Sequence, residues 1–132
     1  MKAIVDTNVL VRAVVLDDRK QAQAAAKLLR TADLVVVSIP TLCEFVWVLR
    51  RVYGFAGEDI SAAIRALLQT SNVVANLPAA DAGLAILDAG GDFADGVIAW
   101  EGQWLGGEIF ASFDKKAVSL LAAQGRPTTL LP

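Results

Sequence analysis

Apolar residues in this chain follow two patterns, short continuous runs and longer segments in which they recur at helical spacing. The continuous runs are typical of strands buried on both faces, and they predict strands at residues 2–5, 34–38, 73–74, 109–112 and 128–131. The periodic segments contain many strong helix formers and predict helices at residues 9–15, 17–30, 40–53, 58–69, 79–89, 93–105 and 115–123. Strands and helices therefore alternate along the chain.

This alternation predicts an α/β fold, a three-layer α/β/α sandwich with a mainly parallel central sheet. Turn residues support the boundaries, because Pro40 suits the first turn of a helix, and Gly54, Gly90 and Gly106 end helical segments. The chain has 132 residues, which falls within the usual size range of one domain. We therefore expect residues 1–132 to form a single domain.

Composition excludes several classes of protein. Apolar residues make up 55% of the chain and charged residues 20%, which argues against disorder. No stretch approaches the roughly 18 apolar residues of a membrane span, and the first residues lack the features of a secretion signal, so we expect a cytoplasmic protein without a membrane partner. Cys43 is the only cysteine, which rules out an intrachain disulfide and a thiolate zinc cluster; its apolar neighbours predict a small buried side chain.

The chain contains no histidine. This excludes imidazole acid–base catalysis, Ser-His and Cys-His nucleophiles, and zinc sites with histidine ligands. Carboxylate chemistry remains, most naturally with Mg²⁺ or Mn²⁺. The net charge of −2 does not show the broad basic surface of many nucleic-acid binders. Bound cations would reverse the local potential, however, so the net charge does not exclude a nucleic-acid substrate.

Four carboxylates occupy places suited to such a site. Asp6 and Asp114 each follow a predicted strand, Glu44 lies one turn into a predicted helix, and Asp95 lies in the first turn of another. An ionised carboxylate beside apolar residues is costly unless a cation or N–H donors compensate it. Ligands of a parallel sheet bind beyond the carboxyl ends of the strands, so we expect all four side chains to reach one edge of the sheet.

Structural roles remain open for most of these acids. Asp6 and Asp114 also suit helix capping, and Asp95 suits interaction with a helix macrodipole. Asp92 is either an exposed N-cap or, three residues from Asp95, a further metal ligand. Glu44 has no basic residue three or four positions away, so a local ion pair does not explain it. The remaining acids at helix starts, turns and polar faces are assigned to solvent: Asp17, Asp18, Asp33, Glu58, Asp59, Asp81 and Asp88.

Four segments carry a family resemblance, and they occur in the family's order: residues 4–8, residues 39–44, residues 92–95 with Ile98 and Ala99, and residues 112–114. In these segments the chain resembles a PIN-domain ribonuclease, and more closely a VapC-type toxin of a type II toxin–antitoxin module. The order and spacing of these segments extend over nearly the whole chain. Three residues depart from the usual pattern: Gly96 stands where an alanine is common, and Trp100 and Trp104 are bulkier than usual and suit either core or a partner surface.

The resemblance implies an acidic site that binds Mg²⁺ or Mn²⁺. Carried over by motif, the catalytic and metal-binding residues are Asp6, Glu44, Asp95 and Asp114, and the supporting residues are Ser112, Asn8 and Asp92. The family cuts RNA in single-stranded or loop regions. VapC-type members are held inactive by a cognate VapB-type antitoxin, and they are commonly homodimers.

The expected reaction is attack of a metal-bound water on phosphorus, which leaves a 5′-phosphate and a 3′-hydroxyl. The basic residues near the motifs either contact phosphates or, more commonly, are ordinary solvated charges: Arg12, Arg50, Arg51, Lys115 and Lys116.

Two other interpretations remain. Haloacid-dehalogenase and receiver domains also have an Asp after the first strand. The former, however, needs a second Asp where Asn8 stands, and the latter needs an acidic pair that is missing here. The other alternative is a non-catalytic PIN-like module that binds RNA or protein.

Overall fold

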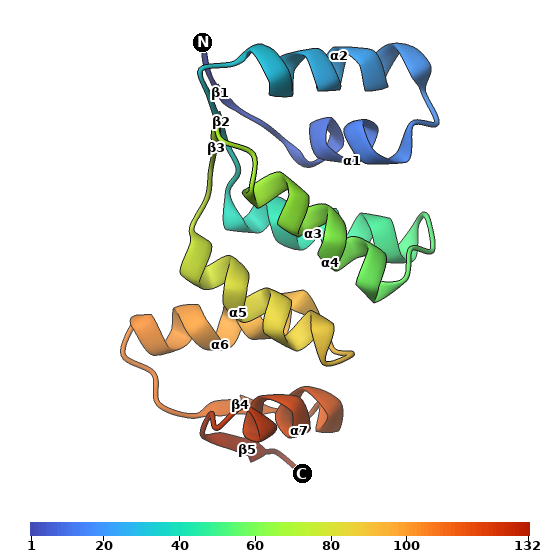
Figure 1. Cartoon of the computed structure of the whole chain (residues 1–132). Helices are drawn as coiled ribbons and strands as arrows, with labels where there is room; N and C mark the ends of the chain where they lie inside the picture. Colours follow the sequence, from blue (N-terminus) through green and yellow to red (C-terminus); the bar gives the residue numbers. More distant parts are fainter. The chain divides into compact units, whose positions relative to one another are not determined.

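Seven helices and five strands alternate along the chain in the order that the apolar pattern predicts (Figure 1). The computed structural model describes residues 1–132. Contacts divide them into an N-terminal unit, Met1–Asn76, and a C-terminal unit, Leu77–Pro132. The elements are β1 (Lys2–Ile4), α1 (Thr7–Val15), α2 (Arg19–Thr31), β2 (Leu34–Val36), α3 (Ile39–Arg51), α4 (Gly57–Leu68), β3 (Val73–Val74), α5 (Leu77–Asp88), α6 (Phe93–Trp104), β4 (Phe110–Ser112), α7 (Lys115–Ala123) and β5 (Thr128–Leu130).

The N-terminal unit is built on a parallel sheet with the strand order β1-β2-β3. Val35 of the central strand is completely buried, as expected for a strand covered on both faces. Helix α1 packs against α2 and α3, and α3 packs against α4. The apolar stripe expected on α3 is present, because its buried residues are Leu42, Phe45, Val46 and Leu49.

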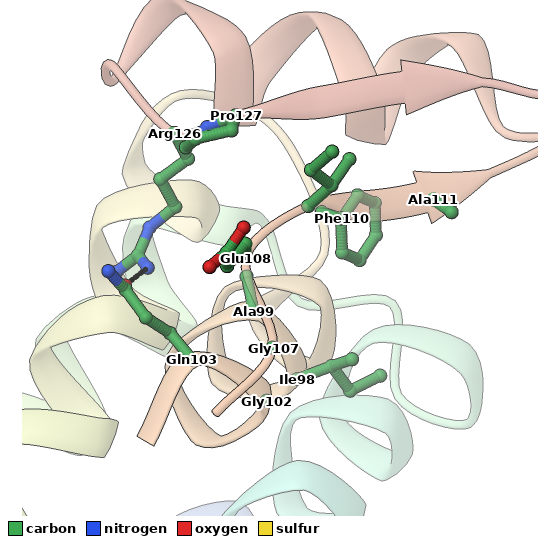
Figure 2. Close-up of a pocket in the computed structure, with 11 residues that line it drawn as sticks. Ile98, Ala99, Gly102, Gln103, Gly107, Glu108, Phe110, Ala111, Arg126 and Pro127 are labelled. Carbon is green, nitrogen blue, oxygen red and sulfur yellow. Dashed lines mark hydrogen bonds between the residues drawn. The ribbon is translucent and has the colours of Figure 1, made fainter. Parts of the chain in front are cut away.

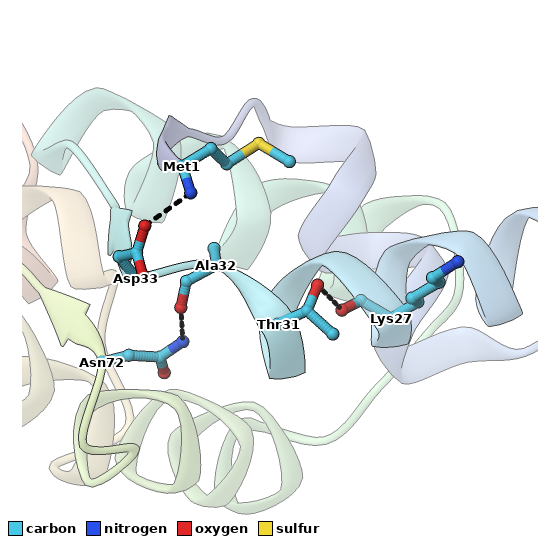
Figure 3. A network of polar contacts seen from close by, with 6 residues as sticks. All are labelled: Met1, Lys27, Thr31, Ala32, Asp33 and Asn72. Carbon is cyan, nitrogen blue, oxygen red and sulfur yellow. Dashed lines mark hydrogen bonds and ion pairs between the residues drawn. The ribbon is translucent and has the colours of Figure 1, made fainter.

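Polar contacts hold the ends of these strands together (Figure 3). The α-amino group of Met1 lies 2.6 Å from Oδ2 of Asp33, and the amide N–H of Asp33 donates to the carbonyl oxygen of Met1 at 2.8 Å. Nδ2 of Asn72 donates to the carbonyl oxygens of Leu29 and Ala32 at 2.9 and 3.0 Å. The segment before β3 is therefore tied to the end of α2, which satisfies backbone groups that the helix itself leaves free.

The C-terminal unit pairs β4 with β5 in parallel, and α7 packs against both strands. Helices α5 and α6 form the most extensive helix pair of this unit and lie side by side in Figure 1. Their shared core includes Phe93, Ile86 and Leu87, and Leu121 of α7 is also fully buried. The Gln124 side chain donates to the carbonyl oxygen of Ala85 at 3.1 Å and ties the end of α7 to α5.

The α/β fold class and the parallel direction of the strands are confirmed. Every predicted element is present within about two residues of its expected bounds, including the two-residue strand Val73–Val74. That the two units form one domain stays a prediction. Cys43 is half-buried, so the expectation of a buried thiol is only partly met. None of the helices is both long and apolar enough to cross a membrane.

Gly96 lies where α6 approaches α5 most closely. A Cβ built on this residue would collide with the carbonyl oxygen of Ala82 and would lie 2.9 Å from Cα of Gly83. The sequence marked Gly96 only as a departure from a common alanine and a weak helix former. The structure supplies the reason for it, because any side chain here would push the two helix backbones apart.

We expect Gly96→Ala to lower the free energy of unfolding by about 1–3 kcal/mol, the usual cost of overpacking. The matched control is Gly102→Ala on the same helix, where an added Cβ meets nothing within 4 Å. That change should raise the free energy of unfolding by about 0.5–1 kcal/mol, because alanine favours helix. Urea unfolding measures both, and a Gly96→Ala protein as stable as the parent would contradict the close packing.

Candidate functional site

Asp6 connects β1 to α1 and is exposed. After β1 the N–H of Val5 still donates to the carbonyl oxygen of Val36 at 3.2 Å, so Asp6 is the first residue beyond the sheet. Its Oδ1 accepts the N–H of Val9 at 3.2 Å, which makes Asp6 the N-cap of α1. The capping role that the sequence left open is therefore present. The second oxygen, Oδ2, accepts no hydrogen bond from the protein, and its role as a metal ligand stays a prediction.

Glu44 lies on the exposed side of α3, opposite the buried stripe. It forms no ion pair and no side-chain hydrogen bond, which agrees with the absence of a basic neighbour in sequence. Ser38, which the sequence analysis did not single out, begins this helix. Its Oγ accepts the N–H of Thr41 at 3.4 Å and lies 3.0 Å from the hydroxyl of Thr41. A Ser two residues before Pro40, at the start of a periodic apolar segment, is the signal that could have identified this cap.

A cavity of about 270 Å³ lies beside Asp6 between α1 and α2. Asp6 and Asn8 line it at one side, and the apolar part of its wall is formed by Val9, Ala24, Ala25 and Leu28. Asn8 is exposed, so its carboxamide is accessible next to the Asp6 carboxylate. The N-terminal unit therefore presents an acid and an amide at the edge of an apolar hollow.

Arg12 lines the same cavity and is half-buried, so the prediction of an ordinary solvated charge is wrong for this residue. Its Nη1 donates to Oδ1 of Asp17 at 2.8 Å, and its buried Nε has no hydrogen-bond partner. The Tyr53 hydroxyl donates to Oδ2 of Asp17 at 3.1 Å. Burial works against the charge of Asp17, but the hydrogen bonds from Arg12 and Tyr53 outweigh it and lower the pKa of Asp17. Asp17 therefore joins α1 to the end of α3 and is more than a solvated acid.

Two of the acids in the C-terminal unit begin helices. Oδ1 of Asp92 accepts the N–H of Ala94 at 3.1 Å and caps α6, which confirms its predicted cap. Oδ1 of Asp114 accepts the N–H of Ala117 at 3.1 Å and caps α7. The hydroxyl oxygen of Ser112 accepts the N–H of Asp114 at 2.9 Å. Ser112 thereby holds the turn that carries the Asp114 carboxylate.

Asp95 differs from these caps, because its carboxylate accepts no hydrogen bond and is half-buried in the first turn of α6. Burial raises its pKa, and the negative charges of Asp92 and Asp114 raise it further. The Asp95 carboxylate is therefore repelled by the carboxylates of Asp92 and Asp114. Such crowding favours either a proton or a bound cation at Asp95.

The acid quartet is divided between the units, with Asp6 and Glu44 in the first and Asp95 and Asp114 in the second. No three acidic or cysteine side chains of the structure lie close enough together to hold a metal ion. That the four acids meet stays a prediction. Their donor set suits Mg²⁺ or Mn²⁺, because every group in it is an oxygen ligand.

A second cavity, of about 360 Å³, lies within the C-terminal unit (Figure 2). The last turns of α6, the loop that precedes β4, and Arg126 with Pro127 form its walls. Nη1 of Arg126 donates to Oε1 of Gln103 at 3.0 Å across this space. The sequence analysis missed both residues, because they are 23 positions apart and neither belongs to a motif.

Residues 3–120 match the family model described as the PIN domain, so the matched segment includes parts of both units and all four acids of the predicted quartet. No curated protein matches the chain.

We expect Asp95→Asn to raise the melting temperature at pH 7 in EDTA. Because the folded-state pKa of Asp95 is raised, the folded protein holds this proton more tightly than the unfolded chain, and stability falls as pH rises through that pKa. The amide removes this loss at neutral pH, and the advantage should disappear near pH 3, below the ordinary aspartate pKa of about 3.9.

Thermal unfolding at both pH values measures the effect, with Asp81→Asn on the exposed side of α5 as the control for loss of one charge. A lower melting temperature for Asp95→Asn at pH 7 would contradict the crowding and assign Asp95 to the helix macrodipole instead.

Proposed function

The chain belongs to the PIN-domain family, and on that premise we propose that it is a Mg²⁺- or Mn²⁺-dependent endoribonuclease. Proteins of this family are typically metal-dependent nucleases. The proposed metal and catalytic ligands are the four acids carried over by motif: Asp6, Glu44, Asp95 and Asp114. The finer assignment to RNA rests on the resemblance of the four motifs to those of VapC-type toxins.

The proposal rests on the surroundings of the Asp95 carboxylate. Its carboxylate is half-buried without a hydrogen-bond donor, and it lies in the field of Asp92 and Asp114. Helix capping explains Asp92 and Asp114, but it does not explain Asp95, which caps no helix. A hard divalent cation converts the same crowding into attraction, because it prefers several oxygen ligands.

The other proposed ligands are also available to a cation. Asp6 and Asp114 each use only Oδ1 for capping, and Glu44 is exposed without an ion pair. Capping fixes the backbone of Asp6 and Asp114, and the Ser112 hydroxyl holds the turn before α7. The metal, when bound, supplies an activated water and stabilises charge on the leaving oxygen. Asn8 lies beside Asp6, where its carboxamide can hold the substrate or a ligand water by hydrogen bonds.

We further propose that the protein is the toxin of a toxin–antitoxin pair and acts as a homodimer. The order and spacing of the four motifs support this role. The apolar hollow beside Asp6 and Asn8 also supports it, because an antitoxin segment lying there would cover two of the proposed site residues.

We expect the purified chain to cut RNA from a total RNA pool with Mg²⁺ or Mn²⁺ and to stop in EDTA, leaving 5′-phosphate ends. Asp6→Asn and Asp95→Asn should each lower the rate by at least about 100-fold, since even partners outside the ligand set cost about 10- to 100-fold. Asp81→Asn is the charge-matched control and should cut like the parent. Sequencing of the product ends measures all of these.

Metal-independent cutting, or 2′,3′-cyclic ends, would contradict this mechanism. RNA binding without cutting in any metal would instead favour a non-catalytic PIN-like module.

We expect expression of the chain to arrest bacterial growth, and Asp95→Asn to relieve the arrest. Co-expression of a VapB-type protein encoded beside its gene should also restore growth and copurify with the chain. Light scattering should give the mass of a dimer. Normal growth of cells that contain an active ribonuclease would remove the toxin role and leave the enzymatic one.

A further inference from the structure

Two tryptophans on α6 form a parallel pair at the surface. The ring centroids of Trp100 and Trp104 are 6.2 Å apart, and their planes differ by 5°. Four residues advance about 6.0 Å along a helix, so the rings follow the spacing of the backbone. Trp104 is 77% exposed although it is one of the largest apolar side chains in the chain. Trp104 therefore lies at the surface, and Trp100 beside it is half-buried.

The space beside these rings is open. Trp100, Gln103 and Trp104 alone line a cleft of about 310 Å³. This volume lies at the lower end of small-ligand sites, which measure about 300–1,000 Å³. Two nearly parallel indole rings and one amide are therefore the groups that border the cleft.

Resting on the proposed ribonuclease function, we propose that this cleft binds one unstacked base of single-stranded RNA. The two rings are nearly parallel, with centroids 6.2 Å apart, so a base that enters the cleft can stack on an indole face. Aromatic side chains are the common platforms for single-stranded nucleic acids, because every base has a π-face.

Polar groups at the cleft suit the rest of a nucleotide. The Arg126 guanidinium can only donate hydrogen bonds, so its contact at 3.0 Å occupies Oε1 of Gln103 and leaves the Gln103 NH₂ to donate. Every base carries an acceptor for that group. Arg126 forms no ion pair with an acid, and its charge is available to a phosphate next to the bound base (Figure 2).

The experiment measures binding of a short labelled single-stranded RNA to the Asp6→Asn protein, which should not cut it. Trp100→Ala and Trp104→Ala should each weaken binding by about 5- to 100-fold. Trp104→Phe should retain most of the affinity, because a phenyl ring still stacks. Arg126→Gln should reduce the dependence of log K on log salt by about 0.7, the value for one phosphate of a single strand.

The matched control is Trp47→Ala, which removes another tryptophan that is 60% exposed but lies on α3 outside the cleft. It should bind RNA like the parent. A fully paired duplex of the same sequence should bind without any dependence on Trp100 or Trp104, because its bases are not free to enter.

The possible failures are distinguishable. If the parent cuts RNA and both alanine variants bind it normally, the base site is wrong and the ribonuclease stands. An equal loss in Trp47→Ala would also overturn the site. If the variants change the mass of the protein in light scattering without changing RNA affinity, the pair is a protein interface. If the parent neither cuts nor binds any RNA, the proposed function fails together with the site.

Discussion

The carboxylate N-cap is the interaction on which this structure most depends. Asp6, Asp92 and Asp114 each begin a helix by accepting a backbone N–H, and two of them do so directly after a strand. The free N–H groups of a helix start carry partial positive charge, so this is where a carboxylate is stabilised without a basic partner. The same local chemistry that sets the boundaries of α1, α6 and α7 also gathers negative charge at helix starts.

Capping and metal binding are consequently compatible roles for one side chain. Each of the three caps uses only Oδ1, so a second oxygen remains for another partner. Asp95 has no such compensation, and the electrostatic cost of the acids of the C-terminal unit is concentrated on it, as its raised pKa indicates. Helix N–H groups therefore stabilise the carboxylates of Asp6, Asp92 and Asp114. The carboxylate of Asp95 has no such donor and depends on a cation or a proton.

Local signals were sufficient to predict the elements, the α/β class and the caps Asp6, Asp92 and Asp114, because periodicity and cap residues act within a few positions. Contacts between distant positions gave no such signal. Tyr53 meets Asp17 across 36 positions, and Asn72 meets Leu29 across 43. The need for glycine at position 96 depends on the backbone of α5, which no residue near Gly96 reveals. The meeting of the four acids at one site is of the same long-range kind, and it stays a prediction beside the family match over residues 3–120.

Helix α6 carries both an acid of the proposed metal site and the proposed base site, and its geometry constrains how one RNA strand could use them. Trp104 lies nine residues after Asp95, which places it about 13.5 Å along the axis and roughly 180° around it; Trp100 lies about 7.5 Å along and roughly 140° around. An RNA strand that reached both Asp95 and the two tryptophans would have to pass around a helix about 10–12 Å wide. Double-stranded DNA stays nearly straight over about 150 base pairs, and a duplex cannot follow such a path. Single-stranded RNA bends freely enough to do so, so the arrangement of α6 would itself select single strands and loops.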